Sequence, residues 1–272
     1  MTLLVVATAA QTLIQDGGRQ AYAHLGVPTS GAFDQRSWRL ANRLVGNPED
    51  AAVLETLGGG LVLRAQRHVT VAVCGAQGEV WVDSRSRSIN EPLVLTPGQS
   101  LHVRHPRTGL RYYIAVSGGL ALPAVLGSQA TDTLGGLGPR IRPGDVLPVG
   151  PRHGHPVVDH VPARRITETL VVTPGPDLDI EPLLQGLWDL DPQSNRIGVR
   201  LIGEPLPAPT ASRPSKPMVR GAVQLPPNGL PIILGPDHPT TGGYPVIAVV
   251  TPESMDDVAQ WPGGTRRFRL AP

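Results

Sequence analysis

Short apolar runs separated by glycine- and proline-rich turns dominate this chain. The first run is Leu3–Ala7, and several more follow before residue 117. These are Leu61–Arg64, Val69–Cys74, Glu79–Asp83, Leu93–Leu95, Ser100–Arg104 and Arg111–Val116. Runs this short and this regularly spaced predict β-strands of a barrel or sandwich. A further strand is expected after the turn Arg142–Asp145.

One segment has the period of an α-helix. Between Asp34 and Val45 the apolar side chains share one face, and the arginines of the segment lie largely off it. Asp34 favours the helix N-terminus. The Gly-Asn-Pro sequence that starts at Gly46 ends the helix.

The second half repeats the plan of strands with few helices. Strands are expected at Thr169–Thr173, Arg196–Gly203, Val219–Gln224, Pro231–Leu234, Val246–Val250 and Thr265–Leu270. Short helical segments are expected at Pro123–Leu126 and Ile180–Leu187. The proline-rich stretch Gly150–Arg165 is the best candidate boundary. We therefore expect a mostly β protein with domains at residues 1–150 and 151–272, which could also be intertwined.

Composition supports a folded protein with many turns. The 272 residues include 32 glycines and 30 prolines, spread along the chain without a fixed period, which excludes collagen. Hydrophobic residues make up 40% and charged residues 17%, which fits a folded chain. Cys74, the single cysteine, lies in an apolar run, so we expect a buried side chain rather than a nucleophile.

Charge and hydropathy limit the classes of partner and the locations that we expect for the chain. The net charge is only +2 and aromatics are 4%, so the stacking platforms of a nucleic-acid groove are not visible. No apolar stretch approaches the roughly 20 residues that span a membrane. No secretory signal is evident. A cytoplasmic location is therefore the expectation.

Candidate chemistry gathers first in the loop Gln15–Asp34. It combines hydrogen-bonding side chains with glycines that let a ligand approach the backbone. Its candidate residues are Asp16, Arg19, His24, Ser30 and Asp34. A structural reading is also open, in which Asp16 caps a turn and pairs with Arg19. We favour a functional loop because binding sites are often loops on rigid scaffolds.

The second candidate loop is Asp237–Pro245. Its core is Thr240-Thr241-Gly242-Gly243, where successive N–H groups could bind a carboxylate or phosphate oxygen. It lacks the lysine and spacing of a P-loop. A plain turn between two strands would explain the glycines but not the hydroxyls.

Other motifs carry little chemistry. His153, His155 and His160 lie in the proline-rich stretch, and we interpret them as solvated side chains rather than metal ligands. No metal site is expected. The Ala-Met-Lys-Met signature is absent, so no covalent biotin is expected on this chain.

Several sequence blocks, in order, resemble one family. They are Gln15–Arg19, Gly26–Gly31, Ala41–Asn47, Leu54-Glu55, Val116–Gly119, Leu126–Ser128, Pro143–Asp145, Pro174–Pro176, Ser194–Arg196, Gly221–Gln224 and Thr240–Pro245. The chain is similar to the biotin-dependent carboxyltransferase-like family, also called KipA-like, allophanate hydrolase subunit 2 or the 5-oxoprolinase C subunit. It departs at Asp237-His238-Pro239, where the family has Asp-Arg-Gln, and at Gln129-Ala130, where it has Arg-Ser.

The resemblance implies cyclophilin-like β-barrels, two in one chain, and a shared activity. With the B-type and A-type subunits of 5-oxoprolinase as partners, such a chain hydrolyses 5-oxo-L-proline to L-glutamate using ATP, which the partners bind or share. Two alternatives stay open. One is a regulatory protein that counteracts a kinase-inhibitor partner, and the other is the carboxyltransferase component of a urea carboxylase-type biotin enzyme.

For the preferred activity we assign two groups of residues. Asp16, His24, Asp34 and Asp237 are candidates to position water or move protons. The lactam and its carboxylate are expected to bind residues from both loops and from the Gly221–Gln224 block. These substrate-binding candidates are Arg19, Ser30, Gln224, Thr240, Thr241, Gly242 and Gly243.

Overall fold

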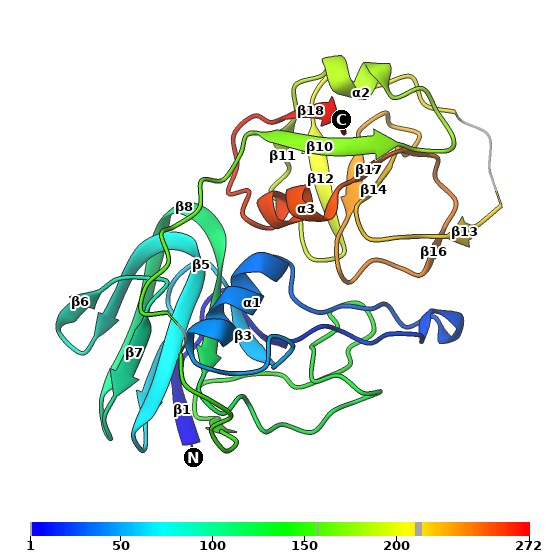
Figure 1. Cartoon of the computed structure of the whole chain (residues 1–272). Helices are drawn as coiled ribbons and strands as arrows, with labels where there is room; N and C mark the ends of the chain where they lie inside the picture. Colours follow the sequence, from blue (N-terminus) through cyan, green and yellow to red (C-terminus); the bar gives the residue numbers. More distant parts are fainter. Residues whose placement is uncertain (1, 157, 210–213) are drawn as a thin grey trace. The chain divides into compact units, whose positions relative to one another are not determined.

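Two curled β-sheets carry the chain, one in each of two units (Figure 1). The structure is a computed structural model that describes residues 2–156, 158–209 and 214–272. Unit 1 consists of Met1–Gly18, Asp34–Thr131 and Leu137–Arg165. Unit 2 consists of Arg19–Phe33, Asp132–Gly136 and Ile166–Pro272. The expected mostly β fold class is confirmed, and the two main sheets are curled half-barrels.

The sheet of unit 1 has the order β2-β3-β8-β4-β1-β9, and β5 adds to it through β8 while also pairing with β6 and β7. Its strands are β1 (Thr2–Ala7), β2 (Gln11–Gln15), β3 (Val53–Leu57), β4 (Val62–Ala65), β5 (Val69–Val82), β6 (Arg85–Arg87), β7 (Pro92–Leu95), β8 (Ser100–Val116) and β9 (Val146–Pro148). All of these pairs are antiparallel. Side chains from one face of these strands form the apolar core of the unit, among them Val5, Ile14, Leu63, Val73 and Ile114.

Strands β5 and β8 correct the sequence prediction. The apolar pattern predicts two separate strands for each, but both run through their polar middles and stay paired across them. The pairing register shifts three times between Gly75 and Val80. Such bulges let a strand bend without ending. Gly78 lies at one of them, where a Cβ would overlap the Tyr112 hydroxyl.

Helix α1 (Gln35–Leu44) confirms the predicted helix. Asp34 is its N-cap, and the Asp34 carboxylate accepts a hydrogen bond of 2.9 Å from the backbone N–H of Ser37. Trp38, Ala41 and Leu44 are buried, so the apolar face packs inward as the periodicity predicts.

The main sheet of unit 2 has the order β11-β12-β15-β14-β17-β10-β18, with only the β10–β18 pair parallel. Its strands are β10 (Thr169–Pro174), β11 (Asp189–Leu190), β12 (Gly198–Ile202), β14 (Ala222–Gln224), β15 (Ile232–Leu234), β17 (Val246–Val250) and β18 (Arg267–Leu270). A second small sheet pairs β13 (Lys216–Pro217) with β16 (Thr241–Gly242). Helices α2 (Glu181–Gln185) and α3 (Pro252–Ala259) complete the unit, whose core includes Trp188 and Trp261.

The sequence pattern does not predict β2, β3 or α3, and one expected helical turn is wrong. Pro123–Leu126 forms no helix, and Val125 makes an isolated bridge with Ser128 instead. The predicted burial of Cys74 is confirmed. Among the described helices, none is long and apolar enough to cross a membrane.

Candidate functional site

The loop Arg19–Phe33 belongs to unit 2 and closes on itself. The backbone N–H of Arg19 donates to the Thr29 carbonyl at 2.7 Å. The loop carries a short 3-10 helix, η1 (Ala23–Leu25), whose residue His24 is exposed. Arg19, by contrast, is only 1% exposed. The loop therefore presents His24 to solvent and buries its arginine.

The end of this loop lies against the loop that contains Asp237. The Ser30 N–H donates to the Pro236 carbonyl at 3.0 Å. The Gly31 carbonyl accepts a bond of 2.7 Å from Arg196 Nη2. The two loops predicted to carry chemistry thus meet within unit 2, although about two hundred positions separate them in the chain.

Ser30 has an unusual conformation for its residue type. Its φ is +58°, in the left-handed region that a non-glycine residue seldom adopts. Its side chain is buried, and the hydroxyl has no hydrogen-bond partner among the described residues. A buried hydroxyl without a partner costs about 1–3 kcal/mol, and strained backbone is often kept at binding sites. Ser30 therefore has the features of a ligand-binding residue.

Asp237 is the centre of a buried hydrogen-bond network. Arg196 contacts it with two bonds of 2.9 Å, Nε to Oδ2 and Nη2 to Oδ1. Thr133 donates to Oδ2 from its hydroxyl at 2.6 Å and from its backbone N–H at 3.1 Å. Arg196 and Asp237 are at most 1% exposed. Both carboxylate oxygens are therefore occupied by this bidentate pair and by Thr133.

The network controls the protonation of Asp237. Burial alone would raise the pKa of this carboxyl, but the Arg196 charge and the bonds from Arg196 and Thr133 outweigh it and lower the pKa. The side chain is therefore an anion at neutral pH. In the neighbouring His238, burial lowers the pKa of the imidazole, so this ring is neutral there.

Asp132 supplies a free acceptor beside this network. It is 1% exposed, and its Oδ1 accepts the N–H of Leu134 at 2.8 Å. Its Oδ2 is buried and has no hydrogen-bond partner among the described residues. Asp132 precedes Thr133, whose side chain holds Asp237. We name Ser30, Asp132, Thr133, Arg196 and Asp237 the Asp237 cluster.

The segment Thr240–Gly243 does not form the expected anion nest. Thr241 and Gly242 form strand β16, which pairs with Lys216–Pro217. Successive N–H groups of a strand point to opposite sides, so they do not converge on one anion. Gln224 lies beside this strand, because a Cβ on Gly242 would come within 2.7 Å of Gln224 Nε2. The structure thus brings Gln224 and Gly242 together, while their role in substrate binding stays a prediction.

Two other candidates belong to unit 1, where each has a local structural task. Asp16 Oδ1 accepts the Ser128 hydroxyl at 2.6 Å and the Gly18 N–H at 2.8 Å, and Oδ2 accepts the Gln129 N–H at 2.7 Å. Asp34 is fully buried and, besides capping α1, accepts the Ser37 hydroxyl at 2.6 Å. These contacts favour structural roles for both carboxylates, and a role in proton transfer stays a prediction.

Sequence reasoning missed three members of the Asp237 cluster as site residues. Arg196 stands out only within a family block, and Asp132 and Thr133 belong to none of the predicted loops. No local signal identifies them, since Thr133 and Asp237 are 104 positions apart. His153, His155 and His160 are exposed, and no cluster of metal-binding residues occurs in the described part of the chain.

Comparison with known proteins identifies the family to which the chain belongs. The family model for the carboxyltransferase domain, subdomain A and B, matches residues 25–270. The C subunit of 5-oxoprolinase from Escherichia coli (strain K12) is 35% identical over 278 residues, covering 96% of this chain and 88% of that protein. The urea amidolyase of Saccharomyces cerevisiae is 31% identical over 297 residues, covering 95% of this chain and 16% of that protein.

Solved structures agree with this placement. The crystal structure of TTHA0988 has a TM-score of 0.91 at 34% identity and covers 98% of this chain. The urea amidolyase of K. lactis has a TM-score of 0.88 at 29% identity over 98% of this chain. This chain spans 55% of the first of those chains and 18% of the second. The protein therefore belongs to the family of the carboxyltransferase domain, subdomain A and B.

Proposed function

We propose that this chain is the C-type subunit of an ATP-dependent 5-oxoprolinase, which converts 5-oxo-L-proline to L-glutamate. The observation that carries the proposal is the match to the C subunit of the E. coli 5-oxoprolinase over 96% of this chain and 88% of that protein. A match along nearly the whole of both chains supports the same task in a complex. Partners of the B and A types would complete the enzyme and would bind or share the ATP.

The reaction must overcome the stability of a lactam. Transfer of the ATP γ-phosphoryl group to the lactam oxygen gives ADP and an activated ring carbon. Water adds to that carbon and the ring C–N bond breaks, so the nitrogen becomes the amine of glutamate and the phosphate stays on the side-chain carboxyl. A second water releases inorganic phosphate. The protein must therefore hold a lactam N–H, a carbonyl oxygen and a carboxylate.

The Asp237 cluster has groups that match the lactam. The open Oδ2 of Asp132 can accept the ring N–H, and the Ser30 hydroxyl can donate to an oxygen of the substrate. Asp237 acts in this proposal as a positioning residue, because Arg196 and Thr133 occupy its oxygens. Its role is to fix Thr133 directly and Gly31 through Arg196; these two residues are the neighbours of Asp132 and Ser30.

The other predicted site residues have supporting roles in this proposal. The charge of Arg19 suits the substrate carboxylate, and Gln224 with Thr240, Thr241, Gly242 and Gly243 would contribute polar contacts. Exposed His24 could take part only where a partner protein covers it. Asp16 and Asp34 would support unit 1. In this arrangement the partner proteins complete the site.

A second candidate activity has its own support. The urea amidolyase of S. cerevisiae matches 95% of this chain, so the chain could instead transfer a carboxyl group from a biotin that another protein carries. The substrate would then be urea, whose N–H and C=O groups resemble those of the lactam. Asp132 Oδ2 and the Ser30 hydroxyl, which have no hydrogen-bond partner among the described residues, suit either amide.

The decisive experiment is co-expression with candidate partners of the A and B types. We expect the purified complex to release glutamate from 5-oxoproline only with ATP, and not when this chain is omitted. Bicarbonate, ATP, a biotin carrier with its carboxylase, and urea form the competing assay. No glutamate from a fully assembled complex would refute the proposal, and carboxylation of urea would replace it with the second candidate.

Matched variants test the site. Ser30→Ala removes the buried hydroxyl, whereas Thr29→Ala removes an exposed one from the adjacent residue. We expect Ser30→Ala to lower glutamate release about tenfold or more, the value of one lost hydrogen bond to a charged group. Thr29→Ala should leave it unchanged. Equal activity of the two variants would remove Ser30 from the site.

A further inference from the structure

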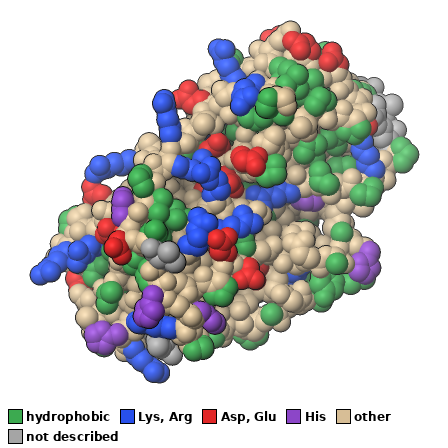
Figure 2. Space-filling view, in the orientation of Figure 1, with side chains coloured by type: hydrophobic (Ala, Val, Ile, Leu, Met, Phe, Trp, Pro, Cys, Tyr) green, Lys and Arg blue, Asp and Glu red, His purple; other side chains and the backbone are tan. Residues whose placement is uncertain are grey.

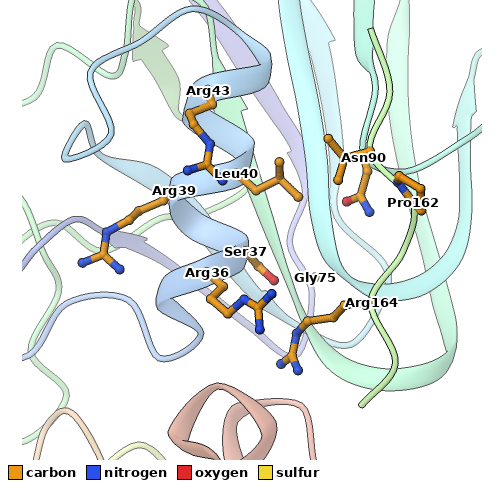
Figure 3. A pocket seen from close by; sticks show the side chains of 10 residues that line it. Arg36, Ser37, Arg39, Leu40, Arg43, Gly75, Asn90, Pro162 and Arg164 are labelled. Atoms are coloured by element: carbon orange, nitrogen blue, oxygen red, sulfur yellow. The ribbon is translucent and has the colours of Figure 1, made fainter. Parts of the chain in front are cut away.

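A cavity in unit 1 is lined by none of the residues of the Asp237 cluster. It has a volume of about 340 Å³ and lies between helix α1, Asn90 and the segment 161–164 (Figure 3). This volume is at the lower end of the range for small-molecule sites. All of its lining residues belong to unit 1.

Arginine dominates the charge of this cavity. Arg36, Arg39 and Arg43 of α1 are among its lining residues, and so is Arg164 of the segment 161–164. Figure 3 shows the guanidinium groups of Arg36 and Arg164 pointing toward each other. On the face shown in Figure 2, basic side chains occur in the region of α1 with acidic side chains among them. No acidic residue is among those that line the cavity.

The nearby carboxylates compensate only part of this charge. Arg43 pairs with Glu49 at 3.0 Å, but both side chains are about half exposed, and such surface pairs contribute little. Asp34 lies 3.8 Å from Arg164 Nη2. Arg36 has no acidic partner among the described residues, and the contacts of Arg39 are with neutral Gln35 and Trp38. Arg36 and Arg39 thus have no carboxylate partner among the described residues, which leaves positive charge at the cavity for an anion.

Asn90 gives an independent indication of a ligand. It lines the cavity, is 4% exposed and has a φ of +59°. Its backbone is fixed by Val73 and Val161, with N–H donating to one and C=O accepting from the other at 2.8 and 3.0 Å. Its buried Oδ1 has no hydrogen-bond partner among the described residues. A ligand donor on this oxygen would offset the cost of about 1–3 kcal/mol of leaving it unpaired.

We propose that this arginine cavity binds a phosphorylated small molecule, with its phosphate held between Arg36 and Arg164. A phosphate monoester carries about two negative charges at neutral pH, which matches the uncompensated charge, and guanidinium forks bind phosphate oxygens in pairs. Leu40, Val161 and Pro162 supply an apolar wall for the organic part. A hydroxyl of the ligand donates to Asn90. The proposal is independent of the 5-oxoprolinase activity.

The test is calorimetric titration of the full chain with inorganic phosphate, pyrophosphate and ribose 5-phosphate at low salt. Glutarate, a dicarboxylate of the same charge, is the comparison ligand. We expect saturable binding of ribose 5-phosphate, stronger than that of phosphate or glutarate, weakening as salt is raised. Absence of saturable binding by all three phosphate compounds would overturn the proposal.

Matched variants locate the binding. Arg36→Gln removes a cavity charge that has no acidic partner among the described residues, and Arg67→Gln removes an exposed arginine outside the cavity. We expect about tenfold weaker ribose 5-phosphate binding for Arg36→Gln, and a change within about twofold for Arg67→Gln. Similar affinities for the two variants would overturn the proposal.

A second variant guards against misfolding. Asn90→Asp suits the left-handed backbone but puts a negative charge in the cavity, so it should abolish binding, whereas Asn90→Gly should keep phosphate binding. Thermal melting checks that each variant is folded. If Asn90→Asp binds ribose 5-phosphate as well as the natural chain does, the cavity is not a phosphate site. The same follows if Arg36→Gln leaves phosphate binding unchanged and weakens only assembly with a partner protein.

Discussion

Replacing Asp237 with alanine should destabilise unit 2 strongly. The substitution leaves the Arg196 guanidinium, 1% exposed, without its carboxylate. It also removes the acceptor of two Thr133 hydrogen bonds. Removing one partner of a buried ion pair costs about 3–5 kcal/mol, because the remaining charge stays buried. We expect the free energy of unfolding of unit 2 to fall by that amount.

The assay is urea denaturation followed by tryptophan fluorescence. Trp188 and Trp261 are fully buried in the core of unit 2 and report its unfolding. Glu204→Ala, which removes an exposed acid from the same unit, is the control and should change the free energy by less than about 0.5 kcal/mol. A loss below about 1 kcal/mol in Asp237→Ala would refute the network as the structure presents it.

A double variant and a pH series sharpen this test. In Arg196→Met with Asp237→Ala neither member of the pair leaves an unpaired buried charge, so the loss should be smaller than the sum of the single losses by about 1–3 kcal/mol. The folded-state pKa of Asp237 is lowered. The unfolded chain therefore binds more protons between that pKa and its unfolded value near 3.9, and stability is lost as pH falls through this window. Asp237→Asn should lack this part of the pH dependence.

Three further predictions concern single residues. Asp34→Ala removes the cap of α1 and should lower the free energy of unfolding of unit 1 by about 1–2 kcal/mol in urea melts, whereas an unchanged value would contradict the capping role. Gly235→Ala puts a Cβ onto the Arg196 carbonyl and should cost about 1–3 kcal/mol, while Gly17→Ala, whose Cβ would meet only Trp38 at 3.5 Å, should cost little. Burial raises the pKa of the Cys74 thiol, so a thiol reagent at pH 8 should label it only on unfolding; fast labelling of the folded chain would show that it is accessible.

Local patterns were sufficient for many elements. The helix predicted between Asp34 and Val45 is α1, because its apolar positions recur with the helical period and Asp34 caps it. Most short apolar runs are strands, because they are short and are bounded by glycine- and proline-rich turns. Where the pattern failed to predict an element, that element buries polar side chains that bond to residues elsewhere in the chain. Helix α3 buries Asp256 and Asp257, so its sequence shows no clean apolar face, and Thr167 donates to Asp257 at 2.8 Å.

The sequence by itself determined the mostly β class, the position of α1 and the two loops that carry candidate chemistry. These features depend on residues close together in the chain, whose period and turn chemistry can be read directly. Only the tertiary structure decided that Asp237 pairs with Arg196 and Thr133, and that Thr241 and Gly242 form a strand. Those outcomes depend on packing between segments up to 104 positions apart, whose approach no local pattern encodes.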